Sequence, residues 1–331
     1  MDGICVLAND RVYDQLVALL NSIEAIYGEN MPVCIYPYDD RTTKISAEIA
    51  RRSYVEIYNN QESIRYWDEF VRNVWDTHPT AQMNWQKLNG EKYHRVGTHR
   101  RYGAFDGPFD RFVYMDADTL LMSPLDRLFA QLENHDWIVY DFQFKDLYHV
   151  YNISSPKLGE LFTPERLRSG TFCSGFYASK KNIFDTQKCS WLLEQLRQGE
   201  SEVLYEMAPD QTLLNYMVMK SGISTYNFSL NLPKSDITGC CVTSNHFEVK
   251  DNVVYDRGKQ LTYLHYIGLS SSLFSRLCSG ENIDFPYRDV FLHYRYLHEP
   301  DKRPKFTTKP KSYNTQPNLA TRIFRKLGIT K

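Results

Sequence analysis

The sequence has no apolar run that approaches the roughly 18 residues a membrane-spanning helix needs, which argues against an integral membrane protein. Near its start it carries Asp2 and only a short apolar stretch at 4–8, so we expect no signal peptide. Its 16 glycines and 14 prolines in 331 residues are no enrichment, which disfavours a fibrous or disordered chain. The seven cysteines have no regular spacing, and Cys240 and Cys241 are adjacent, which suits neither a disulfide framework nor a zinc knuckle. We therefore expect a reducing, cytoplasmic location.

The net charge of the chain is close to zero. With 39 Lys and Arg against 40 Asp and Glu, the net charge is −1, so we expect no nucleic-acid partner. The balance is uneven, because residues 299–331 hold nine of these cations and only two acidic residues. We predict a globular domain over 1–298 and a basic tail over 299–331, made of an extended linker to 317 and a short amphipathic helix at 318–329. Such a helix favours peripheral contact with the inner face of a membrane, and a solvated tail without membrane contact is the alternative.

What the sequence does contain is an alternation of short apolar segments with stripes of apolar residues at helical spacing. The segments predict strands and the stripes predict helices. Together they predict an α/β fold: a single Rossmann-like domain with a central mixed, mostly parallel sheet flanked by helices. Residues 141–170 have weak periodicity and are expected to be irregular. The expected strands are 4–8, 33–36, 55–58, 111–115, 137–140, 172–178 and 261–266. The expected helices are 16–26, 64–75, 123–132, 191–196 and 209–218, and Ser123 is the expected N-cap of the third.

Asp116 and Asp118 form the one D-x-D motif in the chain. They follow an apolar predicted strand, at the edge where open α/β sheets bind their ligands, and strand alternation points both side chains to the same side. Two carboxylates in that position favour a hard divalent cation, Mg²⁺ or Mn²⁺, which in turn suits a diphosphate. The alternative is one helix-capping carboxylate and one carboxylate in an ordinary salt bridge.

Three further segments are candidates for chemistry. His265 lies on a predicted strand; as a ligand beside two carboxylates its imidazole would favour Mn²⁺, and otherwise it is a core residue. Asp210 and Gln211 stand in the first turn of a predicted helix, where an acidic residue also favours the helix dipole. Gly175 lies on a predicted strand and indicates either the close approach of a ligand or a bulge.

Taken in order along the chain, these motifs resemble the signatures of glycosyltransferase family 8. Residues 114–121, YMDADTLL, are similar to the family's YLDADTL segment. The other similar segments are 8–13 (the first-strand nucleotide segment), 22–23 (its SI helix), 174–175 (NSG), 210–215 (DQDxLN), 226–227 (yN) and 265–268 (HfxG). The resemblance spans about residues 3–270, and the ordered set is specific although each segment alone is not.

This resemblance implies a GT-A fold and a metal-dependent transfer of a hexosyl group, with retention, from a nucleotide-sugar, a UDP-sugar above all. The acceptor would be a glycan, a lipid-linked molecule or a protein. The implied ligands of Mn²⁺ or Mg²⁺ are Asp116, Asp118 and His265. Gln211 would lie on the β-face of the donor sugar and Asp210 would bind a sugar hydroxyl, so these two are the implied catalytic residues. The implied donor contacts are Ala8, Asn9, Asp10, Tyr13, Arg100 or Arg101, Asp116, Ala117, Asp118, Ser174, Gly175, His265 and Gly268.

The sequence also departs from the family pattern. The family's GxxKPW segment is here GLSSS at 268–272, so the lysine that contacts the diphosphate is missing. Lys259, Arg276 or a cation of the tail could replace it. The asparagine of NSG is Cys173, and Asp10 stands where many members have two acidic residues.

Three alternatives therefore stay open. An inverting transferase on the same fold, with a GDP-sugar or another nucleotide-sugar, would need a carboxylate base, for which Asp141, Asp210 and Asp236 are candidates. A non-catalytic module that binds nucleotide-sugars is the second. A sugar nucleotidyltransferase is disfavoured, since residues 8–11 contain no glycine for a loop over a triphosphate.

Overall fold

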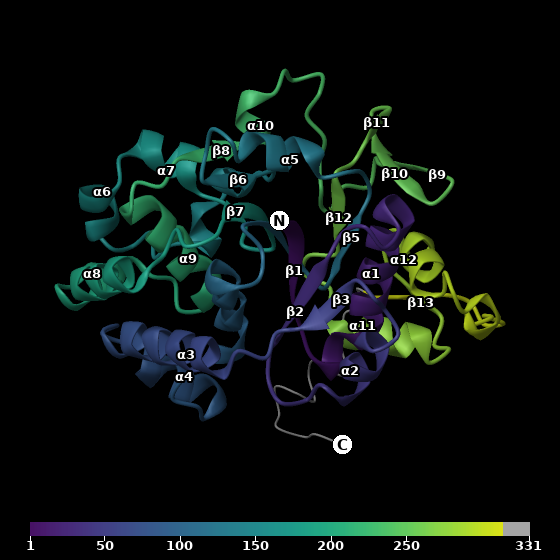
Figure 1. Ribbon diagram of the computed structural model, residues 1–331, viewed down its shortest axis with the longest axis horizontal. Helices are drawn as coiled ribbons and strands as arrows, with labels where there is room; N and C mark the ends of the chain where they lie inside the picture. Colours follow the sequence, from purple (N-terminus) through teal and green to yellow (C-terminus); the bar gives the residue numbers. More distant parts are fainter. Residues whose placement is uncertain (314–331) are drawn as a thin grey trace, which may run out of the picture.

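The computed structural model describes residues 1–313, and its centre is a seven-stranded sheet in the order β3-β2-β1-β4-β7-β6-β8 (Figure 1). Strands β3, β2, β1 and β4 are mutually parallel, β7 is antiparallel to both of its neighbours, and β6 and β8 are parallel. The predicted mixed, mostly parallel sheet is therefore confirmed. The strands are β1 (Asp2–Ala8), β2 (Val33–Pro37), β3 (Val55–Ile57), β4 (Arg111–Asp116), β6 (Trp137–Val139), β7 (Phe176–Lys180) and β8 (Thr225–Asn227).

Each face of the sheet has its own hydrophobic core, because alternate residues of a strand point to opposite sides. On β1, Cys5 and Leu7 belong to one core, and Ile4 and Val6 to the other. The first core is covered by α3 (Gln61–Asp76), α4 (Ala81–Asn89), the 3-10 segment η2 (Val96–Asp106), α6 (Lys157–Leu161), α7 (Pro164–Gly170), α8 (Thr186–Arg197), η5 (Glu200–Val203) and α9 (Pro209–Lys220). The second is covered by α1 (Tyr13–Tyr27), α2 (Thr43–Ile49), α5 (Asp126–Gln131) and α10 (Phe228–Asn231).

A third core lies beside α1 and contains the C-terminal elements. Strand β5 (Thr119–Leu121) pairs antiparallel with β12 (Tyr263–His265), outside the seven-stranded sheet. Helices α11 (Ser271–Cys278) and α12 (Arg288–Arg295) pack against this pair, and α12 also contacts α1. The strands β9 (Glu248–Lys250), β10 (Val253–Asp256) and β11 (Lys259–Gln260) form a small separate sheet.

The beginning of the predicted linker also lies against the domain. Residues 300–302 form the 3-10 turn η6 (Pro300–Lys302), and β14 (Lys311–Ser312) pairs with β13 (Ile283–Asp284). The domain boundary at 298 stays a prediction, and the predicted helix at 318–329 lies outside the described residues. None of the helices within residues 1–313 combines the length and the apolar character that crossing a membrane requires.

Four local predictions are wrong in their bounds. The helix expected at 191–196 is α8, which begins at Thr186 because the Asp185 side chain caps it. The helix expected from Ser123 begins at Asp126, because the Ser123 backbone N–H still donates to the carbonyl of Thr262, at 3.2 Å. The strand expected at 172–178 begins at Phe176, because the side chain of Asn215 hydrogen-bonds both the N–H and the carbonyl of Phe172. Residues 141–170 are only partly irregular: they contain η3 (Gln143–Lys145), η4 (Leu147–His149), α6 and α7.

Candidate active site

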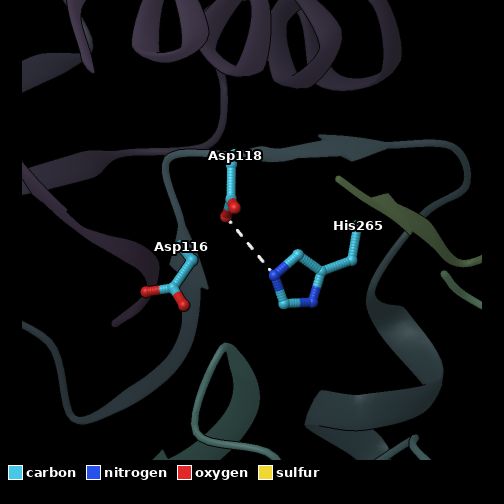
Figure 2. A group of neighbouring side chains, drawn as sticks. All are labelled: Asp116, Asp118 and His265. Atoms are coloured by element: carbon cyan, nitrogen blue, oxygen red, sulfur yellow. Dashed lines mark ion pairs between the residues drawn. The ribbon is translucent and has the colours of Figure 1, made fainter. Parts of the chain in front are cut away.

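The two aspartates of the D-x-D motif and His265 come together at one edge of the sheet. Asp116 is the last residue of β4, Asp118 lies in the turn before β5, and His265 ends β12. The pairing of β12 with β5 sets His265 opposite Thr119, next to Asp118. The ligand atoms of the three side chains all lie within 4.8 Å of one another, and His265 Nε2 is 3.3 Å from Asp118 Oδ1. Figure 2 shows the three side chains converging from two strand ends.

This cluster fits a divalent cation. Two carboxylates supply hard oxygen ligands and the imidazole supplies a nitrogen, a set that Mg²⁺ accepts and Mn²⁺ prefers. The backbone opposite is kept open for them by a glycine: a Cβ on Gly175 would lie 2.7 Å from His265 Cε1 and 2.9 Å from Asp116 Oδ2. A side chain at position 175 would therefore occupy the space in which these ligands meet.

The electrostatics of the cluster follow from its burial and its close charges. Burial alone would lower the pKa of His265, but the attraction of Asp118 and Asp116 outweighs it and raises the pKa to about 9. Burial opposes ionisation of Asp118, yet the adjacent imidazole brings its pKa below the ordinary value. For Asp116 burial prevails over the attraction of Arg101, so its pKa is raised. Without a cation, a proton on His265 thus supplies part of the positive charge that the two carboxylates require.

A buried arginine links the cluster to the predicted catalytic aspartate. The Nη2 atom of Arg101 lies 3.3 Å from Asp116 Oδ1 and 3.0 Å from Asp210 Oδ2. Burial opposes ionisation of Asp210, but Arg101 and His99 outweigh it and lower its pKa. The neighbouring Arg100 instead pairs with Asp68, at 3.0 Å. Of the two arginines that the sequence left open, Arg101 is therefore the one in contact with the cluster.

Gln211 and Ser174 lie next to each other, and Arg101 donates to the Ser174 carbonyl at 2.9 Å. Helix α9 begins with Pro209 as predicted, which puts Asp210 and Gln211 in its first turn. The Gln211 carboxamide is held at both ends: its Oε1 accepts from the Ser174 N–H at 3.1 Å, and its Nε2 donates to the His149 carbonyl at 3.0 Å. The orientation of this amide is therefore set by the protein itself.

The predicted nucleotide contacts at the end of β1 have partners within the protein. The Asn9 side chain accepts from the Arg11 N–H and donates to Asp39, each at 3.0 Å. The Asp10 carboxylate accepts from the backbone N–H groups of residues 44 and 45, at the start of α2. The Tyr13 hydroxyl lies 3.4 Å from Glu48 Oε2. These contacts order the segment, and its role toward a donor stays a prediction.

The remaining predicted donor contacts are backbone positions. Ala8 is buried at the end of β1, and Ala117 is buried between the two aspartates. Gly268 has φ +80°, a left-handed conformation that a residue with a side chain rarely adopts.

Of the proposed replacements for the missing lysine, Lys259 pairs with Asp236 at 2.8 Å and Arg276 with Glu281 at 2.7 Å.

Sequence reasoning missed the part of Tyr114 in this site. Its hydroxyl donates to Asp116 Oδ1 at 2.7 Å, and the guanidinium carbon of Arg101 lies 4.6 Å from its ring centre. The ring also stacks on Tyr177, with centroids 5.0 Å apart. The available signal was strand alternation, since residues 114 and 116 point to the same side of β4.

No model of a known protein family matches the sequence, and no curated protein sequence matches it. Solved structures do match the fold. A galactosyltransferase, LgtC, in complex with donor and acceptor sugar analogues, matches with a TM-score of 0.51 at 14% identity, over 88% of this chain and 100% of that one. The bifunctional glycosyltransferase WbbM in its apo form matches with a TM-score of 0.51 at 12% identity, over 91% of this chain and 51% of that one. At such identities the likeness shows the fold alone, which is of the GT-A type.

Proposed function

We propose that this chain is a glycosyltransferase that uses a divalent cation to bind the diphosphate of a nucleotide-sugar. The observation that carries the proposal is the convergence of Asp116, Asp118 and His265 at the carboxyl end of β4, opposite a glycine that leaves the space between them open. The GT-A fold is consistent with it, since both solved structures described above are glycosyltransferases.

The chemistry of transfer explains why such a set is needed. Breaking the bond between an anomeric carbon and a diphosphate leaves negative charge on the phosphate and an oxocarbenium-like sugar. Asp116, Asp118 and His265 would hold the cation, Mn²⁺ rather than Mg²⁺, and it would supply Lewis-acid stabilisation of the leaving phosphate. Arg101 holds Asp116 and Asp210 in place, and it lowers the pKa of Asp210, which keeps that carboxylate ionised. Asp210 is thereby able to accept a hydrogen bond from a hydroxyl of the donor sugar.

We further propose a UDP-sugar donor and retention at the anomeric carbon. Gln211 is a poor nucleophile, and both ends of its amide are already engaged. Such a group favours attack of the acceptor on the same face from which the diphosphate departs over a covalent intermediate on Gln211.

An inverting reaction is the second candidate, and one observation favours it. Asp210 and Asp236 are each paired with a cation, which makes them poor bases. Asp141 is buried without such a partner among the described residues, and burial raises its pKa to about 7, a value suited to a general base. NMR of the anomeric proton of the product separates the two: retention supports our proposal, and inversion supports the second candidate, in which loss of transfer in Asp141→Asn would identify the base.

The acceptor that we propose is a glycan, with a lipid-linked molecule or a protein as the alternatives. We also propose peripheral membrane contact through the basic tail. Since residues 311–312 pair with β13, the truncation that tests this contact begins at residue 314. Loss of salt-sensitive binding to anionic liposomes on that truncation supports the contact, and unchanged binding refutes it.

The experiment that tests the proposed function is calorimetry of the full chain with UDP, GDP and their sugars, each with Mn²⁺ and with EDTA. We expect metal-dependent binding of one nucleotide, and its loss in Asp116→Asn and Asp118→Asn. A binding-competent chain that neither transfers nor hydrolyses the sugar would be a non-catalytic module. No binding in any condition, or wild-type affinity in both variants, would overturn the proposal.

A further inference from the structure

A cavity is lined by residues of α5, α10 and β11 and of the segments next to them, and it contains no residue of the metal-ligand cluster. Its volume is about 300 Å³, within the range of small-molecule sites. Asp116, Asp118, His265, Arg101 and Asp210 do not line it, whereas Asp236 and Lys259, which the sequence offered as alternatives for the active site, do. The residues that line it are Ser123, Pro124, Arg127, Leu128, Tyr140, Phe228, Asp236, Thr238, Lys259, Gln260 and Thr262.

The cavity combines an apolar floor with free hydroxyl groups. Leu128, Tyr140 and Phe228 are buried and form the apolar part of the lining. Within residues 1–313, the side-chain hydroxyls of Ser123 and Thr262 have no hydrogen-bond partner, so both can donate or accept. A sugar ring has the same division, with C–H groups on its faces and hydroxyls at its edge.

The charge of the cavity is positive because its lining holds two cations, Arg127 and Lys259, and one carboxylate, Asp236. Lys259 is paired with Asp236, at 2.8 Å. Arg127 pairs with no carboxylate among the described residues, and its guanidinium carbon lies 5.5 Å from the ring centre of Phe228. A guanidinium that lines a cavity and forms no salt bridge favours a carboxylate or a phosphate, to which it can donate two parallel hydrogen bonds.

We propose that this cavity binds an acidic saccharide, with Arg127 on its carboxylate or phosphate and the hydroxyls of Ser123 and Thr262 on its ring. That the cavity binds an anion is inferred from its lining alone, whereas the identification of the anion as a saccharide rests on the proposed function. The acid belongs either to the acceptor or to a separately bound sugar. In both cases the site is distinct from the metal-ligand cluster, none of whose three residues lines the cavity.

The test is calorimetry of the full chain with glucose 6-phosphate, glucuronic acid, glucose and inorganic phosphate. We expect saturable binding of the two acidic sugars and at least tenfold weaker binding of glucose and of phosphate alone. Arg127→Gln should weaken binding of the acidic sugars on the order of tenfold. Lys259→Met should weaken it too, because Asp236 is then free to neutralise Arg127. Arg72→Gln is the matched control, since Arg72 is an exposed cation of α3 outside the cavity.

Equal binding to wild type and Arg127→Gln, or glucose binding as tightly as its phosphate, would overturn the proposal. If inorganic phosphate bound as tightly as glucose 6-phosphate, the cavity would bind anions without recognising a sugar, and the saccharide part of the proposal would be wrong. UDP binding with Mn²⁺ is measured on the same samples, so that failure of this cavity and failure of the donor site are told apart. Mass spectrometry after incubation with UDP-sugars and Mn²⁺ identifies the source: a glycosylated acidic sugar is an acceptor, and an unaltered one is a separate ligand.

Discussion

Replacing Gly175 by alanine tests the candidate metal site with the smallest change of side chain. The added Cβ would lie 2.7 Å from His265 Cε1, whereas ordinary van der Waals contact begins at 3.4 Å, so the imidazole or the backbone must move by about 0.7 Å. The Cβ also lies 2.9 Å from Asp116 Oδ2. Metal sites tolerate displacements of about 0.2 Å in ligand distance. The backbone itself is no obstacle, because the φ of Gly175 is not positive.

We therefore expect Gly175→Ala to fold normally and to lose affinity for Mn²⁺ on the order of 10-fold to 100-fold. The assay is calorimetry with Mn²⁺ alone and with Mn²⁺ plus UDP, together with a thermal unfolding curve. Gly159→Ala is the control, because a Cβ on Gly159 would meet nothing within 4 Å. Mn²⁺ affinity equal to that of the wild type in Gly175→Ala would show that the three side chains do not bind the metal in the arrangement described.

Three more predictions follow from the same site. Tyr114→Phe removes the hydrogen bond to Asp116 Oδ1 and should weaken Mn²⁺-dependent UDP binding about fivefold, with little change in Tm. Calorimetry measures the binding, and equal affinity in the variant and the wild type would show that Tyr114 does not orient the Asp116 carboxylate. Arg101→Gln leaves the buried Asp210 and the partly exposed Asp116 without their cation and should cost about 3–5 kcal/mol in the free energy of unfolding. Arg100→Gln should cost less, because it removes the cation of a single carboxylate and the Arg100 side chain is 21% exposed against 4% for Arg101; urea denaturation compares the two, and equal losses would refute the distinction. Asp141 has a folded pKa of about 7 against an ordinary value of 3.8, so the folded state retains a proton that the unfolded chain releases, and stability falls as pH rises from about 4 to 7. Asp141→Asn removes this loss, so its stability relative to wild type should rise by at most about 3 kcal/mol between pH 5 and pH 8; urea denaturation at these two pH values measures the change, and a pH-independent difference would contradict the raised pKa.

The sequence by itself determined the fold class and most of its elements. Apolar periodicity reflects which side of each strand or helix is buried, and that is a local property. The strand before Asp116 and the helix that begins at Pro209 were found in this way. The D-x-D motif at a strand end was enough to indicate a cation site, and the resemblance of the ordered motifs added His265 as its third ligand.

Only the tertiary structure decided which groups meet. His265 stands beside Asp118 because β12 pairs with β5 in one particular register, and no local pattern specifies the register of strands so distant in sequence. Arg100 and Arg101 are adjacent and chemically identical, yet one pairs with Asp68 and the other joins Asp116 to Asp210. The need for glycine at 175 depends on atoms of residues 116 and 265. Such properties arise from packing between elements, which local periodicity does not encode.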